Sequence, residues 1–431
     1  MEMQSWSFML FVLISVLLYW FVVPQRFRPH FLLAISIGYY FTVSFVFAIF
    51  LLIYLYAMYV IGILIDTAEK KRGRVTWLVV GIVVAIGILF VFKARAGLIQ
   101  IAFFALGLGG GKMAAALAAK IGIPLGISYF SFRVIHYLVE VYRGKQLRAT
   151  PLEFFLYITF FPTMVSGPIH RFYTIRREKP EDSFGNQLRG EGGSPPLKFD
   201  DFSYGIWRIL QGVVKKFVIA DFFLKLAGPM MTKMGLAPSV GTLELWVAAH
   251  AWFAYLYLDF SGYSDMAIGL ARLFGFRVME NFNWGVLGHN LQDFWRRWHI
   301  SLTYWVTNYV YIPLGGSRKS EVRTDFNALV TIVVIALWHN INFNMLIWGI
   351  FEGVGLIVFR HYAQLKRRLL PDHKPTWWGK VIGIIMVWTF HGISWPLFHH
   401  PVHIAAIYYL KMFPFLTGLF PILRSLLSVG G

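Results

Sequence analysis

The sequence predicts an all-α polytopic membrane protein with about eleven transmembrane helices plus re-entrant or interfacial helices. Three observations lead to this fold class. Hydrophobic residues make up 57% of the chain and charged residues only 14%, against about 25% charged residues in a typical soluble domain. Apolar runs long enough for spans of ~20 residues recur along the whole chain. The basic residues gather in the short segments between these runs.

The first apolar runs set the expected organisation of the chain. They cover residues 7–23, 30–65, 75–92 and 98–108. The first run resembles a signal peptide, but no small-residue cleavage site follows it, so we expect it to be the first span. We expect residues 1–431 to form a single integral-membrane domain, with residues 1–92 as N-terminal scaffold helices and residues 120–360 as the core. Residues 174–201 carry charges of both signs and predict a polar loop exposed to solvent.

The net charge of +19 invites comparison with nucleic-acid-binding proteins. The cations lie in short loops between apolar runs, where the positive-inside rule and anionic headgroups would place them. We therefore expect membrane lipid, and no nucleic acid, as the partner of these charges. If two spans separate the Arg26 loop from the Lys70–Arg74 loop, both loops face the cytoplasm. The chain has no cysteine, which excludes disulfides and thiolate chemistry.

Two segments before residue 175 place polar groups inside apolar surroundings. Arg133, His136 and Glu140 fall on one face of a predicted helix over residues 123–143. Such a trio is most often a satisfied buried ion pair. Residues 160–171 hold two prolines and a glycine within seven residues. Backbone broken in this way is tolerated inside a membrane only where it is buried in protein or lines a wet cavity.

The apolar run over residues 248–276 contains carboxylates. Asp259 and Tyr263 lie one helical turn apart, and Asp265 follows on the same run. A carboxylate at such a depth is costly and by default functional or paired. A structural pair, for example with Arg272, and a role in contacting substrate both stay open.

Residues 292–316 combine amphipathic periodicity with many functional groups. One continuous helix would gather an aromatic side consisting of Trp295, Trp298, Leu302, Trp305 and Tyr309. The strip beside it would carry Arg296, His299 and Thr303, and the far face would include Arg297 and Ser301. Pro313 and the two glycines after it predict the end of this helix. The pattern favours a helix at a membrane boundary or beside a polar cavity, and an interfacial anchor without chemistry is the alternative.

The apolar stretch over residues 326–359 is too long for one span and too short for two. Asparagines interrupt it directly after His339. At 1.5 Å per residue, a helix from Phe326 to His339 would be only about 21 Å long, shorter than a hydrocarbon core of ~30 Å. We therefore expect His339 at the end of a short helix within the membrane, facing amide side chains in a polar tunnel.

An imidazole in that position has a chemistry available to it, because its ordinary pKa lies near neutrality. It can take the proton from a hydroxyl as the oxygen attacks an acyl carbonyl. Arg296, Arg297 or Asn340 could stabilise the oxyanion that forms. No serine–histidine–acid constellation is readable, and no HExxH or cysteine motif offers a zinc site, so we expect no metal.

Several motifs together resemble the membrane-bound O-acyltransferase superfamily, in the bacterial branch of alginate O-acetylation and teichoic-acid D-alanylation proteins. They are GISYFSFRVIHYLVEVYRG, FFPTMVSGPIHRF, QGVVKKFVIAD, DFSGYSDMAIGLARLFGF, ENFNW, QDFWRRWHISLTYW, YIPLGGSR and LWHN. They span about Gly126 to Gly353. The resemblance implies helices surrounding a tunnel that crosses the membrane, with residues 120–360 as the catalytic core.

The resemblance also implies roles for individual residues. His339 takes the place of the buried catalytic histidine and His299 that of the second histidine. The expected substrate and tunnel-lining residues are Trp295, Arg296, Arg297, Trp298, Ser301, Asp259, Tyr263, Asn281, Trp338 and Asn340. No cofactor is expected to be bound permanently.

The implied reaction moves an acyl group, acetyl on the wording of YIPLGGSR, from a cytoplasmic thioester to a hydroxyl outside. Acetyl-CoA would be the donor. The acceptor would be an exported polysaccharide or peptidoglycan, reached through a periplasmic or extracellular partner protein. The implied location is the bacterial cytoplasmic (inner) membrane. The alternatives are D-alanyl-type transfer from a carrier protein and a non-catalytic membrane carrier, for which we find no internal repeat.

Overall fold

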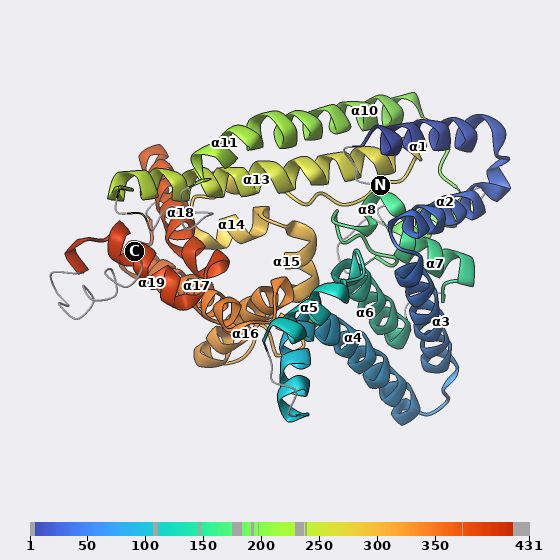
Figure 1. The fold of residues 1–431 in the computed structure, drawn as a ribbon, viewed down its shortest axis with the longest axis horizontal. Helices are drawn as coiled ribbons and strands as arrows, with labels where there is room; N and C mark the ends of the chain where they lie inside the picture. The colour runs from blue at the N-terminus through green and yellow to red at the C-terminus, as the bar shows by residue number, and fades with distance from the viewer. Residues whose placement is uncertain are drawn as a thin grey trace. The chain divides into compact units, whose positions relative to one another are not determined.

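The fold was analysed in a computed structural model that describes residues 5–106, 111–144, 148–174, 183–190, 194–196, 198–228, 237, 239–372 and 374–416. Every secondary-structure element among these residues is helical, as the fold-class prediction requires (Figure 1). The chain divides into two compact units. Unit 1 comprises Met1–Leu210 and Ser264–Glu280, and unit 2 comprises Gln211–Tyr263 and Asn281–Gly431.

Unit 1 holds the N-terminal helices. These are α1 (Trp6–Leu17), η1 (Leu18–Val22), η2 (Gln25–Phe27), α2 (Arg28–Val43), α3 (Phe45–Thr67), α4 (Lys71–Ala105), α5 (Lys112–Lys120), α6 (Ile127–Arg143), α7 (Pro151–Thr159), α8 (Phe161–Met164) and α9 (Phe184–Leu188). Helix α4 continues without interruption through Phe92, where the scaffold segment was expected to end.

Two helices run from one unit into the other, α10 (Phe199–Val214) and α13 (Thr242–Leu273). The remaining helices belong to unit 2. They are η5 (Lys215–Ile219), α11 (Ala220–Leu226), η7 (Gly285–Leu287), α14 (Leu291–Arg297), α15 (Ile300–Val306), η8 (Thr307–Tyr311), α16 (Glu321–His339), α17 (Phe343–Leu369), α18 (Trp377–His399) and α19 (Val402–Met412).

Five of the described helices are long and apolar enough to cross a membrane. They are α3, α4, α16, α17 and α18. Trp6–Val22 forms a shorter apolar helix, at the position of the predicted first span. The structure thus agrees with a polytopic helical membrane protein, and the count of about eleven spans stays a prediction.

Arg133 of α6 bonds the proline-containing segment over residues 160–171 and the helix before it. The buried ion pair expected on α6 is not formed as predicted. Arg133 is fully buried and donates to the carbonyls of Ile158 and Thr163. Among the described residues no carboxylate pairs with it, and Glu140 pairs instead with Arg143 on the next turn. The prolines and the broken helix leave carbonyl groups without intrahelical donors. The guanidinium, with its five donors, supplies what those carbonyls lack.

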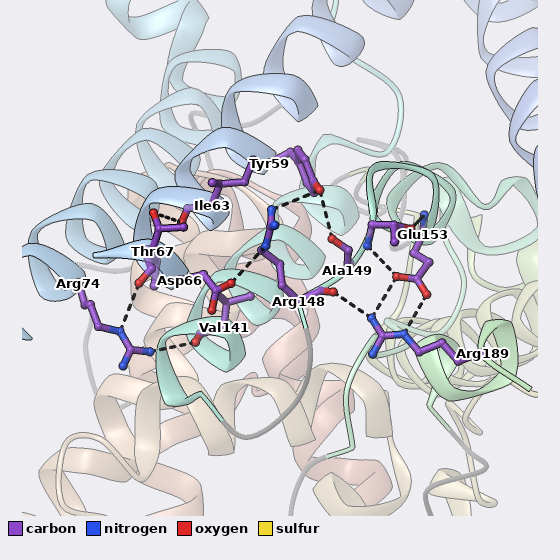
Figure 2. Close-up of polar contacts among 12 residues, drawn as sticks. Tyr59, Ile63, Asp66, Thr67, Arg74, Val141, Arg148, Ala149, Glu153 and Arg189 are labelled. Carbon is purple, nitrogen blue, oxygen red and sulfur yellow. Dashed lines mark hydrogen bonds and ion pairs between the residues drawn. The ribbon is translucent and has the colours of Figure 1, made fainter. Parts of the chain in front are cut away.

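A polar network closes one end of unit 1 (Figure 2). Arg148 pairs with Asp66, and its carbonyl accepts a hydrogen bond from Arg189, which itself pairs with Glu153. Arg74 donates to the carbonyls of Val141 and Tyr142 at the last turn of α6. Arg74 at the start of α4 therefore lies at the same end of the unit as the last turn of α6. Cations on the carbonyl ends of helices are favourable there because these ends carry partial negative charge.

The predicted polar loop is not uniformly exposed. Residues 175–182, 191–193 and 197 of that segment lie outside the described residues. Its described centre contains α9, in which Phe184 is buried against the rings of Phe160 and Phe276. The expectation of a solvent-exposed loop is therefore wrong for α9, because its buried side chains and its backbone bonds to Arg171 and Phe172 hold it in the core.

Helices α16 and α17 form an antiparallel hairpin in unit 2, and they lie side by side in Figure 1. Asn342 caps α17, since its side chain accepts a hydrogen bond from the Met345 amide. The expected break after His339 is confirmed, but the expected short helix is wrong. Helix α16 begins at Glu321, and its 19 residues extend about 28 Å at 1.5 Å per residue.

Close contact in this hairpin depends on glycine. A Cβ atom at Gly349 would lie 2.7 Å from the Cβ of Ala336 and 3.0 Å from the Cα of Val333. A Cβ atom at Gly353, one turn later, would lie 2.7 Å from Cδ1 of Leu329. Small residues four apart let two helices approach until their backbones nearly touch.

We expect Gly349→Ala to lower the unfolding temperature in detergent, because the added methyl group overpacks the hairpin at a cost of about 1–3 kcal/mol. Gly87→Ala is the matched control, since no atom lies within 4 Å of a Cβ at that helical glycine. Thermal unfolding followed by size-exclusion chromatography measures both. Equal unfolding temperatures for the two variants would contradict the packing argument.

Candidate functional site

The predicted helix over residues 292–309 is broken at Trp298–His299, which corrects the single-helix interpretation. Helix α14 ends at Arg297, and α15 begins at Ile300. His299 between them has φ 42°, in the left-handed region. The aromatic side of the segment is nevertheless buried, since Trp298 packs against the rings of Phe253 and Phe294. Because of the break, the His299 side chain does not follow the helical face on which the periodicity had placed it.

A second chain segment clasps this break. The amide of Asn283 donates to the carbonyl of Arg297 over 3.0 Å, and the amide of Ile300 donates to the carbonyl of Asn281 over 2.8 Å. Among the described non-glycine residues, only Trp284 and His299 have positive φ, and both adjoin this pairing. Such a conformation costs about 1–3 kcal/mol per residue and persists where the surroundings fix it.

The side chain of Asn281 fixes the same break from within. It is fully buried, and its Oδ1 lies 2.9 Å from Nδ1 of His299. The same oxygen accepts hydrogen bonds from the hydroxyl of Ser301, at 2.8 Å, and from its amide, at 3.4 Å. The structure therefore brings together three predicted site residues, Asn281, His299 and Ser301, around one amide oxygen.

The two candidate histidines lie on either side of Trp338. The Trp338 ring centroid is 5.9 Å from that of His299 and 4.7 Å from that of His339. His339 is exposed and also meets the rings of Trp348 and Phe398. It is therefore not enclosed among aliphatic side chains.

Two of the asparagines after His339 bond elsewhere in the chain, whereas a tunnel-lining role of Asn340 stays a prediction. Asn340 is the C-cap of α16, and Asn342 is the N-cap of α17. Asn344 donates to the carbonyl of His400. The Asn342 side chain thus caps the start of α17, and the backbone N–H of Asn340 bonds the Ala336 carbonyl at the end of α16.

His299 lies outside the five candidate membrane-spanning helices and is buried. Burial and, after it, the electrostatic effect of His339 lower the pKa of His299 to about 3. The imidazole is therefore neutral at physiological pH. Its Nε2 is buried and has no hydrogen-bond partner among the described residues.

A cavity of about 270 Å³ lies beside this centre within unit 2. Its walls come from α14, α15, η8, α16 and α17, and the residues are Gln292, Trp295, Arg296, Thr303, Val306, Thr307, Tyr311, Thr324, Ala328, Thr331, Ile332, Ile335, Leu356, Ile357, Phe359 and Arg360. Thr303 follows His299 by four residues, and Ile335 precedes His339 by four. The cavity wall thus includes residues four positions from each histidine along the chain.

Two of the predicted lining residues, Trp295 and Arg296, line this cavity. The others that were named, and both histidines, are not among its walls. Sequence reasoning missed the face of α16 that does contribute, although Thr324, Ala328, Thr331 and Ile335 follow a helical repeat. Hydroxyl-bearing residues at that spacing in an apolar helix were the available signal.

Asp293 is a second residue that sequence reasoning missed. Its carboxylate is buried and lies within 3.0 Å of nitrogen atoms of Arg296, Arg297 and His289. Burial by itself would raise its pKa, but hydrogen bonds from Arg297 and Arg296 outweigh burial, so the pKa of Asp293 is lowered. The spacing of an acid three and four residues before two arginines on a helix could have revealed it.

Two carboxylates of α13, Asp259 and Asp265, are each paired within one unit. Asp259 pairs with Lys216 of η5 in unit 2, and Asp265 pairs with Arg208 of α10 in unit 1. Arg272, the partner considered from sequence, pairs instead with Asp201. Tyr263 is half-buried. The structural-pair alternative is thus realised, and a substrate role for Asp259 or Tyr263 stays a prediction.

Another buried pair joins α17 to α18. His391 Nδ1 lies 3.2 Å from Glu352 Oε1, and the His391 ring packs against Phe294 and Phe253. Both ends are buried, so the pair fixes α18 against the aromatic cluster around Trp298. Among the described residues no group of three histidine, cysteine or acidic side chains is arranged to hold a metal ion.

Residues 32–400 match the profile of the family described as MBOAT, membrane-bound O-acyltransferase family. The match covers most of the chain, and the chain belongs to this family. The resemblance found in the motifs is therefore confirmed, and His299 at the α14–α15 break and His339 at the end of α16 form the candidate site.

The chain is also similar to individual named proteins. The chain is 37% identical over 305 residues to the probable alginate O-acetylase AlgI of Pseudomonas aeruginosa, covering 70% of this chain and 55% of the relative. It is 30% identical over 305 residues to the peptidoglycan O-acetyltransferase of Helicobacter pylori, covering 64% of this chain and 54% of the relative. It is 25% identical over 290 residues to the teichoic acid D-alanyltransferase of Streptococcus thermophilus, covering 64% and 68%. The chain thus spans little more than half the length of the first two relatives.

We expect Asp293→Asn to lower the unfolding temperature at pH 7, because two arginines lose their buried carboxylate partner. Because folding lowers the pKa of Asp293, its ionised carboxylate stabilises the folded protein at pH values above 3.8, the ordinary carboxyl pKa. This stabilisation is lost as the pH falls through the lowered pKa of the folded state. The difference from wild type should therefore shrink below about pH 4. Unfolding temperatures in detergent across this range measure it, with the exposed Asp372→Asn as control. A difference that persisted unchanged in acid would exclude the ion-pair explanation.

Proposed function

We propose that this chain is a membrane O-acyltransferase that moves an acetyl group from a cytoplasmic thioester, acetyl-CoA, towards a hydroxyl outside the cytoplasm. The acceptor would be an exported polysaccharide, peptidoglycan or a periplasmic or extracellular partner protein. Family membership and the O-acetyltransferase names of two relatives support the reaction class. The observation that carries the proposal is the pair of histidines beside Trp338, with a cavity whose wall includes residues four positions from each along the chain.

The chemistry is a balanced exchange of one acyl bond for another. The acceptor oxygen attacks the thioester carbonyl, the new ester bond forms, and the carbon–sulfur bond breaks. His339 takes the hydroxyl proton as a general base, and that proton finally resides on the CoA thiol. His339 can approach a substrate because its ring is exposed. An imidazole acting instead as the transient acyl carrier would occupy the same position.

The cavity beside the histidines suits the slender part of the donor. Small-molecule pockets commonly measure ~300–1,000 Å³, so a volume of about 270 Å³ fits an acetylated pantetheine arm better than a whole nucleotide. Threonine hydroxyls along the walls can bond the amide groups of that arm. Arg296 and Arg360 at the cavity can bind the phosphates, since guanidinium groups match phosphate oxygens in geometry.

The placement in the cell follows from the same reasoning. The long apolar helices make the chain a multi-pass membrane protein. A cytoplasmic donor and an acceptor outside require the bacterial cytoplasmic membrane. They also require that a partner protein or glycan reaches the outer end of the path.

We expect His339→Ala to abolish acetyl transfer while the protein stays folded, because no other group would take the hydroxyl proton. The assay incubates purified protein with radiolabelled acetyl-CoA and alginate or peptidoglycan oligosaccharides, and follows CoA release and labelled product. His403→Ala, an exposed histidine of the same unit, is the control. Transfer retained by His339→Ala would remove it as the essential group.

The same assay separates the other functions. Transport of acetyl-CoA without CoA release would indicate a carrier. Release only from a D-alanyl carrier protein would indicate the chemistry named for the Streptococcus thermophilus relative.

We expect Ala328→Trp to raise the KM for acetyl-CoA at least tenfold, because the indole would fill the cavity beside α16. Val322→Trp on the same helix is the control, since that side chain is 80% exposed. Steady-state CoA release measures both. An unchanged KM would place the donor elsewhere.

A further inference from the structure

The amide oxygen of Asn281 determines which nitrogen of His299 carries a proton. The Ser301 amide can only donate a hydrogen bond, and it points to the Asn281 side-chain atom that also meets His299 Nδ1. That atom is therefore the carbonyl oxygen and not the amide nitrogen. An oxygen can only accept, so Nδ1 of His299 must be the donor and must carry a hydrogen.

A neutral imidazole has one N–H group, so Nε2 of His299 keeps an unshared electron pair. The buried Nε2 has no hydrogen-bond partner among the described residues. Edge-on rings of Phe260 and Trp338 neighbour the imidazole, with centroid distances of 4.8 and 5.9 Å. A buried acceptor of this kind is costly unless a ligand or water completes it.

We propose that Asn281 is a positioning residue that holds His299 as the Nδ1–H tautomer, so that Nε2 accepts a hydrogen bond from the acceptor hydroxyl. The proton of that hydroxyl is then taken by His339, not by His299. The low basicity of the buried His299 fits this division, because a weak base accepts a hydrogen bond without removing the proton. The role of the hydroxyl rests on the proposed acyl transfer, whereas the tautomer does not.

The paired backbone makes Asn281 suited to this role. Its carbonyl accepts from Ile300, so main chain and side chain hold both sides of His299. His339 is the titratable group that acts electrostatically on His299 from a neighbouring helix. Asn281, Ser301, Phe260 and Trp338 carry no charge, so the tautomer depends on hydrogen bonding rather than on a nearby ion.

The direct test is nitrogen NMR of full-length protein carrying ¹⁵N-labelled histidine rings, with the His299 signals identified by their loss in His299→Gln. We expect wild type to show a protonated Nδ1 and an unprotonated Nε2. Asn281→Leu should mix or reverse the tautomers. Asn327→Leu, which removes another buried asparagine of unit 2 that bonds the Gly316 carbonyl, should leave them unchanged. A wild-type Nε2–H signal, or an unchanged tautomer in Asn281→Leu, overturns the proposal.

Kinetics with acetyl-CoA and alginate oligosaccharides then tests the consequence for transfer. Loss of a group that orients a catalytic histidine commonly costs 10–100-fold, so we expect kcat of Asn281→Leu to fall by about that factor with the KM for acetyl-CoA unchanged.

Asn281→Asp keeps the acceptor oxygen and should restore transfer at alkaline pH. Its carboxylate raises the pKa of His299, so transfer should fall as the pH decreases and His299 becomes protonated. An Asn281→Asp enzyme as inactive as Asn281→Leu at every pH, with wild type active, overturns the positioning role. An inactive wild type with the expected tautomer would overturn the acyl-transfer proposal alone.

Discussion

One left-handed residue organises unit 2. His299 interrupts what would otherwise be a continuous amphipathic helix, and the conformation is unfavourable for any side chain with a Cβ. It persists because the 281–283 segment pairs with the chain on both sides of it. Without this clasp the segment would gain by rewinding into a helix, and the imidazole would turn away from Trp338. The strain at His299 is thus the condition for bringing it near His339.

The aromatic cluster around Trp298 makes this conformation tolerable. Trp298 directs its ring into a stack with Phe253 and Phe294, and the same rings enclose the His391–Glu352 pair. Burial of large aromatic surfaces stabilises by more than the backbone strain costs. Several buried polar atoms of this region have no hydrogen-bond partner among the described residues, and they include Nε2 of His299, Nε2 of His391 and Oε2 of Glu352.

The acidic side chains beside the cavity and those in the packed helices have different balances of neighbouring positive charge. Asp259 and Asp265 of α13 are matched to cations of η5 and α10, so they tie helices together. Asp293 instead faces three nitrogen-bearing side chains and leaves an excess of positive charge beside the cavity. Such an excess is suited to an anionic ligand, whereas matched pairs are suited to scaffold. The distinction separates the residues that bind substrate in our proposal from those that hold the helices.

The amino-acid sequence determined the helical membrane class, because apolar length and loop charge are properties of composition and order alone. It also located the break after His339 and, through its motifs, the family. Only the tertiary structure decided the backbone conformation and side-chain direction of His299. Local periodicity favours a continuous helix, and hydrogen bonds with Asn281 and Asn283 hold the chain out of it. The partners of Arg133, Asp259 and Asp265 were likewise settled by distant segments. Helical spacing shows which side chains share a face, but which groups face them across an interface is fixed by packing.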